Sequence, residues 1–235
     1  WVQPNDKGRI LRLEIRGGLP VRSATVAHGM SHPNGIRIHR GHVYVTQSLL
    51  VKEGDEPLIS GVYRFKLDDR NVKVHNTLDD ANLLVTLKTL NPKVQYGADG
   101  LVFDSRGNLF VGNFGDGTVH KITFDAAGNV AANTIFAQSE CMKSVDGICV
   151  DSHDNLYVAD FSSNAVCLVS PEGKVSVLAK SPDCDGARGG LDQPGEPLVR
   201  GGELVVSNFD MVTGPDKVNT QHDAPYTLSV ISLND

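Results

Sequence analysis

A hairpin-like segment that occurs twice in this chain limits the possible folds more than any other feature. The first copy spans 98–114 and the second spans 145–161, 47 residues later. Each copy has a short β-rich run, a turn rich in Gly, Asn or Asp, and a second β-rich run, which is typical of a β-hairpin. Weaker copies begin near Asn34 and Glu196. Hairpins repeated at this spacing predict the blades of a β-propeller.

Further β-rich runs follow the hairpins and complete the predicted blades. Third strands are expected at 61–66, 118–122, 165–169 and 227–231, and fourth strands near 134–136 and 175–178. The composition agrees, because 24 Gly, 11 Pro and only 6% aromatic residues suit short strands joined by tight turns. A parallel α/β fold would need helical segments that the sequence does not contain.

We predict one all-β domain over 1–235, a six-bladed β-propeller of four-stranded antiparallel blades, with the N-terminal part of the ring absent from this chain. Residues 1–30 are expected to form the outer strands of one blade. The further blades are expected at 31–90, 95–140, 143–182 and 193–235. An upstream segment or a second chain would then complete the ring, since an open sheet edge invites association.

Charge and hydropathy exclude several classes of partner. The net charge is −6, whereas binding to nucleic acid or to an anionic membrane needs a basic face. No apolar run approaches the roughly 18 to 20 residues that span a bilayer. We therefore expect a soluble protein that acts on a small molecule. The compartment stays open, and so does a disulfide between Cys141 and Cys184.

The repeat places oxygen-bearing side chains at one end of the predicted channel, which we call the mouth. The first strand of each blade lines the channel, and the second strand returns to the same end. The residues that open the first strands are Asn34, Asp99, Asp146 and Glu196. The residues that end the second strands are Gln47, Asn113, Asp160 and Asn208, which we expect to bind substrate. Carboxylate and amide oxygens suit a hard cation, so calcium, or another divalent cation, is the predicted ligand of the first group.

Each of these residues also has a purely structural interpretation. Asp-Gly and Asn-Gly pairs form turns through bonds from the side chain to the backbone. It is the recurrence at one position in four blades that favours a metal site. By contrast, Asp104 and Asp151 are expected only to organise hairpin turns. Phe114, Phe161 and Phe209 are expected to pack between blades rather than to line a cavity.

Several motifs resemble the regucalcin/gluconolactonase family of calcium-dependent lactonases, which are six-bladed propellers. They are Ser31-His32-Pro33-Asn34-Gly35-Ile36, Val62-Tyr63-Arg64-Phe65, Asp99-Gly100 and Gly107-Asn108-Leu109. The resemblance implies that Asn34 and Asp99 bind calcium and that Asp99 is the general base. Two further ligands of the family would lie before Trp1. Asp146 and Glu196 are inferred from the repeat and not from the family.

The predicted function is calcium-dependent hydrolysis of a lactone or a similar small cyclic ester by water that a carboxylate activates at the mouth. No Gly-x-Ser-x-Gly motif supports serine chemistry. The motif Asn155-Leu156-Tyr157-Val158-Ala159-Asp160 also resembles the NHL repeat, whose propellers often bind protein or nucleic acid without catalysis. A strictosidine-synthase-like enzyme is a further alternative, because the fold alone does not choose among these functions.

Overall fold

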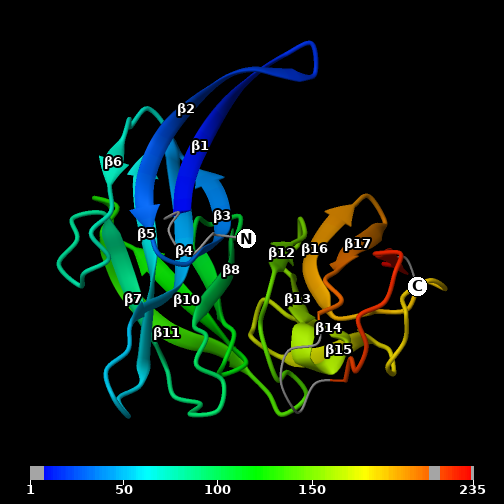
Figure 1. Ribbon diagram of the computed structural model, residues 1–235. Helices are drawn as coiled ribbons and strands as arrows, with labels where there is room; N and C mark the ends of the chain where they lie inside the picture. The colour runs from blue at the N-terminus through cyan, green and yellow to red at the C-terminus, as the bar shows by residue number, and fades with distance from the viewer. Residues whose placement is uncertain (1–7, 212–217, 234–235) are drawn as a thin grey trace.

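The computed structural model describes residues 8–211 and 218–233, which form five sheets (Figure 1). The first sheet contains β1 (Gly8–Arg16), β2 (Leu19–Met30) and β6 (Val72–Lys73); the second contains β3 (Pro33–His39), β4 (His42–Val51), β5 (Leu58–Lys66) and β7 (Leu83–Thr89). The third contains β8 (Ala98–Phe103), β9 (Leu109–Asn113), β10 (Thr118–Phe124) and β11 (Val130–Gln138). The fourth contains β12 (Ile148–Val150), β13 (Leu156–Asp160), β14 (Ala165–Val169) and β15 (Val175–Lys180), and the fifth contains β16 (Pro194–Arg200), β17 (Glu203–Asn208) and β18 (Leu228–Ser232).

These sheets are the blades of a β-propeller, as the repeat predicts. Within each blade, strands that follow one another in the chain pair antiparallel. The first strands β3, β8, β12 and β16 lie next to one another in that order along the channel. The described residues thus form five blades. One pairing was not expected: β6 leaves the second blade and pairs parallel with β2.

Apolar clusters between neighbouring blades hold the fold together. One cluster joins the third and fourth blades through fully buried side chains such as Val119, Ile148 and Val158. Similar clusters join the first blade to the second, the second to the third, and the fourth to the fifth. Each buried aliphatic or aromatic side chain contributes about 1.5 to 3 kcal/mol, so packing between blades accounts for much of the stability.

Glycines set how closely the first strands approach one another. A Cβ added at Gly35 would lie within 3.0 Å of the backbone oxygen of Asp99, and one added at Gly100 would meet Asp146 in the same way. The amide of Gly100 also donates to the carbonyl of Asp146 at 3.0 Å. The residue after Asn34, Asp99 and Asp146 is thus glycine because the backbone of the next blade occupies the space of a Cβ, whereas Glu196 is followed by Pro197.

Aspartates organise the hairpin turns as predicted. Asp104 Oδ1 accepts from the amides of Arg106, at 3.0 Å, and Asn108, at 2.7 Å. Asp151 Oδ1 accepts from His153 and Asn155 at 2.8 and 2.9 Å. These Asx-type bonds satisfy turn amides, so neither carboxylate belongs to the mouth.

Two other sequence features have a simple structural outcome. The sequence also predicts an insertion over roughly 49–59 at one hairpin exit, and in the structure this segment mostly lengthens the hairpin of β4 and β5, because Val51 pairs with Ile59. Cys141 and Cys184 are free thiols, so the pairing that the sequence left open does not form here. Within the described residues, no helix has the length and hydropathy that crossing a membrane requires.

Candidate functional site

Four neighbouring blades each bring one polar side chain to the start of their first strand. Asn34 is the second residue of β3, Asp99 is the second residue of β8, and Asp146 lies just before β12. Glu196 is near the start of β16. The strands that carry these four residues are neighbours along one channel, as the repeat predicts.

The acidic centre of this group is Asp99, which is only 3% exposed. Burial raises the pKa of its carboxyl well above the usual value, and the charges of Asp146 and Glu196 raise it further. Asp99 also makes a side-chain hydrogen bond with Asp146. Because two ionised carboxylates repel each other, this contact needs a proton or a cation between them.

Asn34 and Tyr96 border the acidic pair. Asn34 Nδ2 lies 3.4 Å from the hydroxyl of Tyr96 and 3.4 Å from the hydroxyl of Ser48. Burial raises the pKa of Tyr96, and the negative charges of Asp99 and Asp146 add to this effect. The phenol therefore stays protonated and provides a hydrogen-bond donor at the edge of the acidic group.

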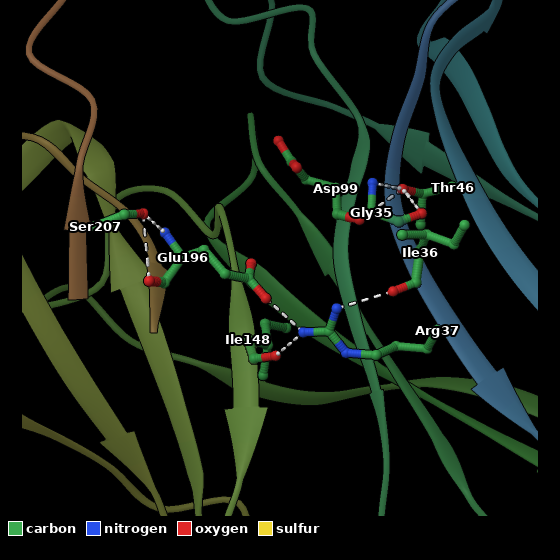
Figure 2. A network of polar contacts seen from close by, with 8 residues as sticks. All are labelled: Gly35, Ile36, Arg37, Thr46, Asp99, Ile148, Glu196 and Ser207. Carbon is green, nitrogen blue, oxygen red and sulfur yellow. Dashed lines mark hydrogen bonds and ion pairs between the residues drawn. The ribbon is translucent and has the colours of Figure 1, made fainter. Parts of the chain in front are cut away.

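Glu196 takes part in a different interaction, with Arg37 of β3. Figure 2 shows the Arg37 guanidinium reaching across the channel to the Glu196 carboxylate, with which it forms an ion pair. Arg37 also donates to the carbonyl of Ile148 at 3.2 Å. In the same view, the Asp99 carboxylate points away from this ion pair. The positive charge at the mouth thus lies beside Glu196 and not between Asp99 and Asp146.

Sequence reasoning missed Arg37 and Tyr96. Arg37 lies on β3 beyond Asn34, and a charged residue in a strand predicted to line the channel was the signal that could have found it. Tyr96 precedes the β8 repeat and carries no motif. Its position at the mouth depends on the connection from β7 to β8, which the repeat does not describe.

The four residues predicted to end the second strands are buried, and both polar atoms of each side chain are engaged inside the protein. Three of them do end their strands, whereas β4 continues beyond Gln47 to Val51. Gln47 accepts from the amide of Ser31 at 3.0 Å and donates to Asn76. Asp160 accepts from the amides of Lys143 and Ser144 at 2.9 and 3.0 Å. Asn113 is bonded to Thr89 and Lys88, and Asn208 to Asp192, Thr227 and Ser229. These side chains therefore hydrogen-bond the hairpin to the segment that connects it to the preceding blade, which is a structural role.

Aromatic rings line up along the same end of the blades. Tyr96 and Phe114 have ring centroids 5.7 Å apart, Phe114 and Phe161 are 5.6 Å apart, and Phe161 and Phe209 are 5.9 Å apart. Phe114 and Phe161 are buried, so they pack between blades as expected. Phe209, the last ring of the row, is 52% exposed.

The donors at the mouth fit a hard cation in their chemistry. No three His, Cys, Asp or Glu side chains in 8–211 and 218–233 are grouped closely enough to hold a metal by themselves. The carboxyls of Asp99 and Asp146 are nevertheless in contact, and the Asn34 amide comes from the adjoining strand. Calcium completes its shell of six to eight oxygens with carbonyls and water, so two carboxylates and an amide form a reasonable core.

Comparison with known proteins supports the fold. No protein-family model matches the chain, and no curated protein matches it in sequence. A luciferin-regenerating enzyme shares 14% identity with a TM-score of 0.65, over 99% of this chain and 75% of that enzyme. An aldose sugar dehydrogenase from Streptomyces coelicolor, solved with PQQ bound, shares 14% identity with a TM-score of 0.52, over 97% of this chain and 73% of the dehydrogenase chain.

A gluconolactonase from Xanthomonas campestris shares 16% identity with a TM-score of 0.49 over 78% of this chain. This chain spans 55% of that protein's length. At identities this low, structural similarity leaves the activity open, because one fold supports many functions. The fold assignment rests on the two structures with the higher TM-scores.

Proposed function

We propose that this protein is a calcium-dependent hydrolase of a lactone or a similar small cyclic ester, with the reaction at the mouth of the propeller. The observation that carries the proposal is the buried Asp99 carboxyl in contact with Asp146. Placing two carboxyls together in a buried site is costly, and a divalent cation relieves the cost. The resemblance of the Asn34 and Asp99 motifs to calcium-dependent lactonases supports the same function.

The residues at the mouth have distinct proposed roles. Asn34, Asp99 and Asp146 hold the cation, and Glu196 becomes a fourth ligand when its carboxylate leaves Arg37. A bound calcium ion would polarise the lactone carbonyl and stabilise negative charge on its oxygen. Asp99 accepts a proton from the attacking water, and the Tyr96 hydroxyl donates a hydrogen bond at the edge of the site. Gln47, Asn113, Asp160 and Asn208 support this site by fixing the loops around it.

Metal analysis combined with thermal melting tests the proposal. We expect about one calcium per chain and a clear fall in the melting temperature when a calcium chelator is added, because a ligand that binds only the folded state stabilises it. Turnover of simple lactones should disappear with the metal and return when calcium is restored. A metal-free protein with an unchanged melt would argue instead for an NHL-type propeller that binds a partner.

The stabilisation by calcium should grow with pH. In the metal-free protein the folded-state pKa of Asp99 is raised, so the folded state holds a proton that the unfolded state has lost. The free energy of unfolding therefore falls as the pH rises from the ordinary carboxyl pKa through the folded one. Calcium offsets the repulsion between the ionised carboxylates, so the calcium-induced rise in melting temperature should increase as the pH rises above the ordinary carboxyl pKa. A rise that shrinks over this range would contradict the assignment.

We also infer that the complete propeller has six blades, closed by strands that this chain does not contribute. Two apolar surfaces border the open side of the ring. Ile36 and Ile38 of β3 are 45% and 67% exposed, whereas the outer part of the same blade is covered by β1 and β2. On the fifth blade, Leu198 and Leu228 are 61% and 64% exposed. An upstream segment or a second chain that supplies inner strands would bury both surfaces.

Charged substitutions on these surfaces test this inference. Ile38→Lys together with Leu198→Lys should reduce self-association and the binding of a hydrophobic dye. The melting temperature should change little, because exposed side chains contribute little to stability. Light scattering measures the self-association, and dye fluorescence measures the exposed apolar surface. Val158→Lys is the control that should unfold the protein, because Val158 is fully buried. Unchanged association in the double variant would show that these surfaces are not the ones that another segment covers.

A further inference from the structure

A cavity of about 410 Å³ is lined by residues of β1, β2 and β6 and by the residues on either side of β6. Figure 1 shows these three strands side by side in the first sheet. Its lining includes Arg9, His28 and Lys73, together with Thr25, Gly29 and Asn71. None of these residues belongs to the acidic site, and none has a role in the proposed hydrolysis. The cavity therefore needs an explanation of its own.

Strand register places the three basic residues in one row. Arg9 of β1 is the cross-strand partner of His28 of β2, and His28 is the partner of Lys73 of β6. Partners across adjacent strands point to the same face of a sheet. Since neighbouring strands are about 4.8 Å apart, the Arg9 and Lys73 backbones are about 10 Å apart, and their long side chains can reach one ligand between them.

The row has no acidic counterpart. No Asp or Glu lines the cavity, and among the residues that the structure describes, none of the three forms an ion pair. The protein as a whole has a net charge of −6, so a basic row without acidic partners is a local exception that a bound anion would stabilise.

The cavity also offers neutral donors and open space. Thr25 has a hydroxyl and Asn71 has a side-chain amide at the lining. The backbone there is fixed, because the amide of Asn71 donates to the carbonyl of Thr25 and the amide of Val74 donates to that of His28. Gly29 has φ of +89°, and a Cβ there would lie 3.1 Å from the carbonyl oxygen of Val74. Glycine thus keeps this wall of the cavity free of a side chain.

We infer that this cavity binds the phosphate group of a small anionic molecule. A guanidinium, an ammonium, a hydroxyl and an amide on a rigid sheet form a donor set suited to an oxyanion with several charged oxygens. The volume exceeds that of one phosphate group, so the remainder of the ligand also fits. The inference is independent of the lactonase proposal, because the site uses other residues on another sheet.

Calorimetric titration with pyrophosphate in calcium-free buffer tests the inference. The wild-type protein should bind pyrophosphate, and the Arg9→Gln and Lys73→Gln variants should each bind it at least about tenfold more weakly. Both side chains are exposed, so the variants should keep the wild-type melting temperature. Lys174→Gln is the matched control, since it removes one exposed positive charge from the fourth blade and should leave the affinity unchanged.

The other outcomes overturn the inference. Binding that weakens equally in Lys174→Gln would reflect overall charge. Equal binding of acetate and pyrophosphate at matched ionic strength would show that the cavity does not select phosphate. Absence of any pyrophosphate binding by a folded wild-type protein would show that the basic row is only a solvated surface. Because the buffer contains no calcium, none of these results depends on the acidic site.

Discussion

Replacing Asp99 with asparagine is expected to lower lactone turnover by about 10²- to 10⁴-fold, the usual contribution of a general base. The same change should raise the melting temperature of the calcium-free protein. Asparagine has nearly the same shape, but it removes the carboxyl whose pKa is raised by burial and by the charges of Asp146 and Glu196. Steady-state kinetics and calorimetry measure the two effects. If the site is kept for function at the expense of stability, turnover should fall while the melting temperature rises.

The matched control is Asp151→Asn, which makes the same chemical change at a turn. Asp151 accepts hydrogen bonds from the amides of His153 and Asn155 and from the Asn155 side chain. Asparagine can keep only part of this set, so the melting temperature should fall while turnover stays the same. If Asp99→Asn instead lost stability and kept turnover, Asp99 would be a structural residue like Asp151.

Replacing Gly100 with alanine is expected to lower the free energy of unfolding by at least about 3 kcal/mol, the upper end of the range for overpacking. The new Cβ would lie within 3.0 Å of backbone atoms of Asp146, Gly147 and Ile148. Backbone atoms held by a neighbouring blade cannot rotate away as a flexible side chain can. Urea unfolding measures the loss, and turnover should fall as well, because the same shift displaces Asp146 from Asp99.

Gly195→Ala provides the comparison, because this glycine is in the fifth blade next to Glu196. The nearest atoms to its added Cβ are in Ser207, at 3.5 and 3.8 Å, and in Phe209, at 3.9 Å. These are ordinary contacts, so the change in stability should stay within about 0.5 kcal/mol. Equal losses for Gly100→Ala and Gly195→Ala would indicate a general cost of removing glycine, and close approach between blades would then not be its cause.

Local patterns predicted most of the fold. Hairpins such as β8 with β9 depend on alternation within the strands and on turn residues such as Asp104, and both are visible in the sequence. The parallel pairing of β2 with β6 was not predictable in this way. It joins Ala27 to Val72 across a whole intervening hairpin, and its two-residue length leaves no recognisable pattern.

The candidate site was predictable only in part, for a similar reason. The repeat places Asn34, Asp99, Asp146 and Glu196 at equivalent positions, but it does not give the direction of each side chain. Glu196 turns to Arg37 because a long arginine reaches across the channel, and that reach depends on the curvature of the ring. Asp160 faces inward because the amides of the preceding connection need an acceptor.

Where the first strands approach closely, two adjacent residues have separate roles: one sets the spacing between blades, and the other provides the donor atoms. The side chain before each glycine changes from Asn34 to Asp99 to Asp146, while the glycines Gly35, Gly100 and Gly147 keep the contact with the next blade. The spacing of the ring is thus encoded in one residue and its chemistry in the residue before it. Donor atoms at the mouth can therefore be exchanged without redesigning the scaffold, which makes this propeller a suitable frame for building sites with other ligand preferences.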